Sequence, residues 1–193
     1  MSATVDMAGL TPDTRAAWYA FQQAALDQLG FDLQPRSARR TCAEQAEQWA
    51  IGRSGPSDTR TPTTRAQGCR SWHVSGHAVD FFVFVNGKKS FISSDYTKAG
   101  LLAESMGLVW GGRFQGFGPN GDEGHVEWHP DLTQADVCPD PTHCVDVEPS
   151  EDTGGPLEQS MFGRLGWKGA LAIGVLTLTV AVGGGVVLAR RQR

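Results

Sequence analysis

The chain lacks a cluster of basic residues interleaved with aromatic ones ahead of its C-terminal end. Its 17 lysines and arginines are outnumbered by 21 acidic residues, and the net charge is −4 at pH 7. Domains that bind nucleic acid usually carry a concentrated basic surface. The sequence therefore predicts no nucleic-acid partner.

The N-terminus also lacks a recognisable export signal. It is short and polar, without a basic region followed by an apolar stretch, so no secretory signal peptide is predicted. The composition leaves room for one domain of ordinary size plus a tail.

One long uncharged run lies near the C-terminus, at residues 169–189. As a helix it would be about 31 Å long, which matches a bilayer core. It has no polar face, so a buried globular helix fits poorly. We predict a transmembrane helix here, after a linker at 146–168 rich in Glu, Asp, Ser, Pro and Gly. The basic tail 190–193 favours a cytoplasmic C-terminus, with the domain at 1–145 on the other side.

Within residues 1–145, helices and short strands alternate. We expect a helix from Thr11 to Gly30, a second from the capping box at Thr41 to about Gly52, and a third from Asp95 to Met106. Extended segments are expected at 31–33, 78–85, 109–110 and 125–128, with a turn at Asn86-Gly87 that pairs 78–85 with Phe91-Ile92. Residues 52–68 are expected to form a loop over the substrate side. This pattern indicates an α+β domain with a small antiparallel sheet flanked by helices.

Two segments, 71–80 and 122–128, contain the side chains of a catalytic zinc site. They offer two imidazoles and a carboxylate as ligands, and a further carboxylate as a base. Catalytic zinc is usually held by three protein groups, while the fourth position is left to water, whose pKa falls towards neutrality. The two segments therefore predict a hydrolytic site.

The first segment follows the pattern Ser-x-His-x-x-Gly-x-Ala-x-Asp. The matching residues are Ser71, His73, Gly76, Ala78 and Asp80. This pattern resembles the zinc peptidases that cut peptidoglycan stem peptides, a group that contains D-alanyl-D-alanine carboxypeptidases and phage L-alanyl-D-glutamate endopeptidases. The family's second element, an acidic residue three positions before a histidine, is met by Asp122 and His125. The resemblance implies the fold of the hedgehog and DD-peptidase group.

The resemblance extends over roughly residues 8–132. Residues 37–41 resemble the family's Ser-Gly-Tyr-Arg-Ser/Thr stretch, with Arg40 at the arginine position. Residues 107–112 match its Gly-Leu-x-Trp-Gly-Gly run. Two features depart from the pattern: Arg113 stands where relatives often have an acidic residue, and the loop 112–122 is rich in glycine. Both departures affect the substrate groove and leave the ligands intact.

The resemblance also implies roles for single residues. His73, Asp80 and His125 would be zinc ligands, and Asp122 the general base that passes a proton to the leaving amine. Arg40 would face a substrate carboxylate, which a planar guanidinium holds with two hydrogen bonds.

Other polar residues receive smaller roles. Ser71 is expected in the substrate pocket, and Gly76 at a close approach of the backbone. Glu127 lies two positions after His125 in an extended segment and would orient a ligand, or be an exposed strand residue. Glu123 is the rival base and is expected to be solvated. Four further residues are expected at the groove, at the surface or in packing: His77, His129, Trp72 and Trp128.

Four cysteines are present, at positions 42, 69, 138 and 144. In a cell-wall enzyme an even number is compatible with two disulfides formed outside the reducing cytosol. We expect Cys138 to pair with Cys144, and Cys42 with Cys69, because both regions should converge on the active site. Free buried thiols, or a structural zinc bound by Cys138, His143 and Cys144, are the alternatives.

These expectations define a function to test. We expect a zinc-dependent peptidoglycan hydrolase that cuts a stem-peptide amide bond, first of all between L-Ala and D-Glu, and is anchored in a membrane with its domain facing the cell wall or periplasm. A phage virion that contains a membrane would explain the missing export signal. D-Ala-D-Ala carboxypeptidase activity is the close alternative. A non-catalytic, membrane-attached wall-binding protein is a third, although no repeat array of wall-binding modules is seen.

Overall fold

Three helices begin within two residues of the positions expected from the sequence. α1 (Pro12–Leu29) has Thr11 as its N-cap, and ends at Gly30 with a left-handed φ of 68°, a conformation that glycine adopts without strain. α2 (Cys42–Ala50) opens with the predicted capping box between Thr41 and Glu44. α3 (Ser93–Ser105) begins two residues before the predicted Asp95.

The computed structural model describes residue 5 and residues 7–116, 119–140 and 143–146. Among these, five strands form one antiparallel sheet in the order β1-β2-β5-β4, with β3 also paired to β2. The strands are β1 (Phe31–Ser37), β2 (Ala78–Val85), β3 (Lys88–Lys89), β4 (Val109–Trp110) and β5 (His125–Glu127). The predicted α+β class with a small antiparallel sheet is confirmed.

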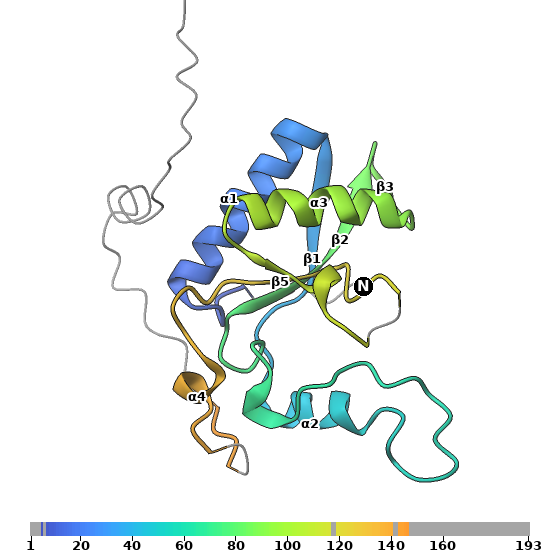
Figure 1. Cartoon of the computed structure of the whole chain (residues 1–193), viewed down its shortest axis with the longest axis vertical. Coiled ribbons are helices and arrows are strands. Elements are labelled where there is room, and N and C mark those ends of the chain that lie inside the picture. The colour runs from blue at the N-terminus through green and yellow to red at the C-terminus, as the bar shows by residue number, and fades with distance from the viewer. Residues whose placement is uncertain (1–4, 6, 117–118, 141–142, 147–193) are drawn as a thin grey trace, which may run out of the picture. The chain divides into compact units, whose positions relative to one another are not determined.

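The two faces of the sheet have different surroundings (Figure 1). Alternate residues of β1 and β2, such as Leu33 and Phe81, are buried against α1 and α3 and form the core with Trp18 and Phe21. Successive strand residues point to opposite faces. Asp80 therefore lies on the other face, the side towards α2 and the predicted loop 52–68, and this side contains the candidate site.

The hairpin after β2 is shorter than predicted. Asn86 and Gly87 have φ values of 51° and 73°, as a two-residue type I′ turn requires. A two-residue turn pairs its immediate neighbours, so Val85 faces Lys88 and Phe84 faces Lys89. The expectation that Phe91 and Ile92 form the returning strand was wrong, because the turn closes before the chain reaches them.

Two disulfides are present as expected, but the predicted pairing was wrong. Cys42 is bonded to Cys144 and Cys69 to Cys138, with Cα atoms 5.9 and 5.3 Å apart. The reason is the path of the chain after residue 132. The short helix α4 (Gln134–Val137) lies beside the 3-10 helix η1 (Gly68–Arg70), so each C-terminal cysteine meets a partner from a different early segment.

No helix in the described part of the chain is long and apolar enough to cross a membrane. The predicted linker 146–168 lies outside the described residues except for its first position, and the predicted transmembrane helix 169–189 and basic tail 190–193 lie wholly outside them.

Candidate metal centre and its cavity

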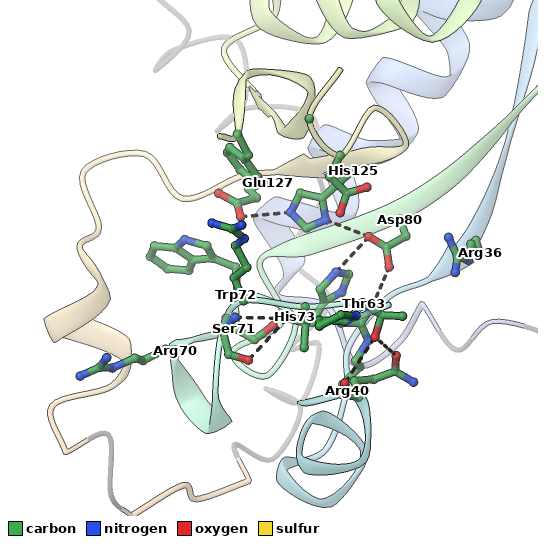
Figure 2. A pocket seen from close by; sticks show the side chains of 18 of the residues that line it. Arg36, Arg40, Thr63, Arg70, Ser71, Trp72, His73, Asp80, His125 and Glu127 are labelled. Atoms are coloured by element: carbon green, nitrogen blue, oxygen red, sulfur yellow. Dashed lines mark hydrogen bonds and ion pairs between the residues drawn. The ribbon is translucent and has the colours of Figure 1, made fainter. Parts of the chain in front are cut away.

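The sheet brings three predicted ligands to one point. Asp80 on β2 pairs directly with His125 on β5, and His73 comes from the turn that precedes β2 (Figure 2). Asp80 Oδ1 lies 2.8 Å from His125 Nδ1 and 3.1 Å from His73 Nε2. All three side chains are buried, and one donor atom from each lies within 4.8 Å of the others.

In both histidines, the ring nitrogen that does not face Asp80 has a partner of its own. The other nitrogen of His73, Nδ1, donates to the carbonyl oxygen of Ala38 at 2.6 Å. The other nitrogen of His125, Nε2, lies 3.0 Å from Glu127 Oε1. A ligating histidine commonly uses its second nitrogen in this way, which leaves the first one for a metal. With Zn–N bonds of about 2.0 Å, tetrahedral donors lie about 3.3 Å apart, so the donor set fits zinc.

Without a metal, the protonation states of Asp80, His125 and His73 depend on one another. Burial acts to raise the pKa of Asp80, but the two imidazoles outweigh it and hold that pKa well below its usual range. Burial acts to lower the pKa of His125, but hydrogen bonds with Asp80 and Glu127 raise it to about 10. Burial lowers the pKa of His73. One imidazolium therefore offsets the carboxylate charge when no metal is bound.

Arg40 contacts the oxygen of Asp80 that the two histidines do not contact. Its Nη2 donates to Asp80 Oδ2 at 2.5 Å, while its Nε donates to Ser37 Oγ at 3.2 Å. Its Nη1 donates to the fully buried Gln45, whose amide is held by the carbonyl of Ala66. The resemblance implied that Arg40 faces the substrate, and it does line the cavity. The contact with Asp80 is an addition that sequence spacing did not reveal.

Asp122 lines the same cavity. Its backbone amide donates to the carbonyl of Gly111 at 2.8 Å, and its own carbonyl accepts from the amide of His125 at 3.2 Å. A Cβ atom at Gly111 would lie 2.5 Å from that carbonyl, which explains the need for glycine in the Trp-Gly-Gly run. Burial raises the pKa of the Asp122 carboxyl.

Glu123 is not a rival base. Its carboxylate accepts a hydrogen bond from Ser93 at the start of α3, and its carbonyl accepts one from Trp110 Nε1 at 2.9 Å. It is half-buried and is not among the residues that line the cavity. It was expected to be solvated and is only partly exposed, because the turn between Asp122 and His125 directs it towards α3.

The sequence of this region matches a known family. Residues 64–128 match the model of a family described as D-alanyl-D-alanine carboxypeptidase. The matched segment includes His73, Asp80, Asp122 and His125. With the three grouped donors, the match supports a metallopeptidase site.

The chain is also similar to a solved structure. That structure is the L-Ala D-Glu endopeptidase ChiX of Serratia marcescens, with 21% identity, 67% of this chain and 89% of that chain covered, and a TM-score of 0.46. No curated protein matches the chain.

Beyond the donors, the metallopeptidase site continues through Glu127 to the cavity wall. Glu127 is buried, and its second oxygen, Oε2, lies 2.8 Å from His129 Nε2. His129 stacks on Trp72, with ring centroids 3.9 Å apart and planes 4° apart. The prediction that His125 and Glu127 share a face is confirmed. The link to His129 and Trp72 was missed, although residues 125, 127 and 129 alternate as a strand requires.

Ser71 and Gly76 shape the turn that presents His73. Ser71 is buried and lines the cavity. Gly76 has a φ of 74°, and a Cβ atom there would lie 2.7 Å from the carbonyl oxygen of Gly9. The expected close approach is confirmed, and its partner is the segment that leads into α1.

The cavity has a volume of about 740 Å³ and several cationic side chains in its wall. Besides Arg40, these are Arg36, Arg65 and Arg70. Residues 62–66 of the predicted loop also line it, which agrees with the expectation that this loop lies on the substrate side. The family pattern contains only the arginine at position 40, so sequence reasoning missed the other three.

Proposed function

We propose that the domain is a zinc-dependent peptidoglycan hydrolase that cleaves an amide bond of the stem peptide, most directly the bond between L-Ala and D-Glu. The observation that carries this proposal is the grouping of His73, Asp80 and His125 in one cavity with Asp122. Three donors and a separate carboxylate are what hydrolysis at a zinc centre needs.

Each residue has a distinct task in this proposal. Zinc, when bound, polarises the scissile carbonyl and lowers the pKa of water. Asp122 accepts the proton of the attacking water and delivers it to the leaving amine. Its partly buried setting suits both steps, because a raised pKa brings the carboxyl closer to the pH at which it must gain and lose a proton. Arg40 holds Asp80 from behind and places a guanidinium in the cavity.

Side chains line the cavity on both sides of the donors. Trp72 and Arg70 lie on one side of the donors, and Arg36 lies on the other (Figure 2). An endopeptidase needs space for the chain on both sides of the scissile bond, whereas a carboxypeptidase needs one end closed. D-Ala-D-Ala carboxypeptidase activity stays the second candidate, because the arginines of the wall suit a terminal carboxylate.

Mass spectrometry of purified peptidoglycan separates these candidates. The domain is incubated with zinc, with a chelator, or as the Asp122→Ala variant. New L-Ala carboxyl and D-Glu amino termini that need both zinc and Asp122 would support the endopeptidase. Released D-alanine would assign the carboxypeptidase. No product from a folded, zinc-loaded domain would support the wall-binding alternative.

Membrane anchoring by residues 169–189 and a domain that faces the cell wall or periplasm complete the proposal. The support is compositional: an uncharged run of bilayer length followed by a basic tail. Retention of the full chain in carbonate-washed membranes, and release of a chain that ends at residue 145, would support it. In a phage, the protein should be found in virion membranes; its presence only in the membranes of uninfected cells would contradict that origin.

A further inference from the structure

A cationic and aromatic surface extends from the candidate site along the outer face of β2. Residues 80, 82 and 84 alternate with the core residues of this strand, so Phe82 and Phe84 lie on the same face as Asp80. Phe82 is half-buried. Two cations lie over its ring: Lys89 Nζ is 3.1 Å and Arg36 Cζ 5.6 Å from the ring centroid.

Arg36 follows Gln34 on this face of β1 and stands at a β-bulge. Pro35 pairs with Phe81 and Ser37 with Asp80, so two neighbours on β2 face three residues of β1, and Arg36 is the additional one. A bulge of this kind is frequent next to active sites. Arg36 lines the cavity and also covers Phe82, which makes the surface continuous with the site.

Neither cation forms a close ion pair within the described residues, although the charge of Arg36 acts at longer range to lower the pKa of Asp122. Asp32, which lies on the same face of β1, accepts a hydrogen bond from Gln34 at 2.8 Å. Lys89 Nζ also lies 5.2 Å from the ring of Phe91, which is 85% exposed. Two like charges close to one ring repel each other unless an anion lies nearby.

We propose that Arg36, Phe82 and Lys89 form an extended subsite that binds the acidic part of a stem peptide beyond the scissile bond. The ring of Phe82 positions the two cations through cation–π contacts, and the cations pair with the free carboxylates of the peptide. This inference rests on the proposed function and identifies residues that would select an acidic, continuing substrate chain.

The test compares two stem peptides of equal length that contain the same scissile bond. One has free carboxyl groups beyond the bond, and the other has these groups amidated. The variants are Arg36→Gln, Lys89→Gln and both together. Lys98→Gln is the matched control, because Lys98 is an exposed cation on α3. The double variant should lower kcat/KM about tenfold for the acidic peptide and less than twofold for the amidated one.

Other outcomes would overturn the inference. An equal loss for both peptides would mean that the cations only stabilise the hairpin, and no loss would mean that the peptide passes elsewhere. Loss of binding to anionic phospholipid vesicles, with unchanged cleavage, would assign the surface to a membrane.

A binding measurement separates this inference from the proposed function. Affinity for the acidic peptide is measured in an Asp122→Asn background, where turnover is not needed. If the wild type cleaves neither peptide, the proposed function fails, and the binding data still decide whether Arg36 and Lys89 hold the acidic chain. Equal binding with and without the two cations would overturn the inference alone.

Discussion

Asp80 and His125 face each other across β2 and β5, with Asp80 Oδ1 2.8 Å from His125 Nδ1. Hydrogen bonds to Asp80 and Glu127 raise the pKa of His125 to about 10, so its imidazole is protonated at pH 7 when no metal is present. Zinc binds only neutral imidazole. His125 must therefore lose its proton before the metal is bound.

Proton release on metal binding follows from this relationship. At pH 7, zinc should displace about one proton from His125, and its apparent affinity should rise with pH up to the metal-free pKa. Calorimetric titration in two buffers of different ionisation enthalpy measures the released protons. Equal heats in the two buffers would mean that His125 is already neutral.

Glu127→Gln should weaken zinc binding by about 10- to 100-fold, because the amide removes the charge that orients His125 and raises its basicity. Competition with a chromogenic chelator measures the affinity. The matched control is Glu123→Gln, which alters a carboxylate four residues away in the chain that contacts Ser93 and should leave the affinity unchanged. An equal loss in both variants would indicate general disruption of the loop.

Asp122→Asn should lower kcat by about 10²- to 10⁴-fold, the usual range for a general base, while zinc affinity and Tm stay close to the wild type. The base acts only when it is deprotonated. Since burial raises its pKa, the acidic limb of kcat/KM should lie above the range of an ordinary aspartate. An acidic limb that is unaltered in the residual activity of the variant would assign that limb to another group.

The two disulfides should matter for stability more than for metal binding. Cys69 and Cys138 are 69 positions apart, and Cys42 and Cys144 are 102 apart. Replacing one pair by serines should cost about 2–5 kcal/mol of the free energy of unfolding, as for native disulfides of small domains. Urea unfolding with and without a thiol reductant measures this. A wild-type midpoint that does not change on reduction would contradict the prediction.

Local patterns made much of the site predictable. His73 and Asp80 lie seven positions apart in one motif, and the alternation of 125 and 127 set the face that Glu127 shares with His125. The capping box of α2 and the glycine after α1 were equally local. Each of these features depends on residues within one or two turns or one strand.

Contacts between distant segments could not be predicted. The ion pair of Arg40 with Asp80 and the disulfide partners depend on the path of the whole chain. The bulge at Arg36 is a difference of one residue between paired strands, which no propensity of β1 alone reveals. The shortened hairpin was a local error, since the turn at Asn86-Gly87 was recognised but its consequence for pairing was not.

Restoration of hydrolysis by zinc tests the central claim most directly. The chelated protein is titrated with zinc while peptidoglycan cleavage is followed, in parallel with Asp80→Ala. We predict that activity returns in proportion to zinc and is complete at one equivalent, and that Asp80→Ala remains inactive at the same concentrations. Full activity of the chelated wild type, or equal restoration in Asp80→Ala, would contradict a metal centre built on His73, Asp80 and His125.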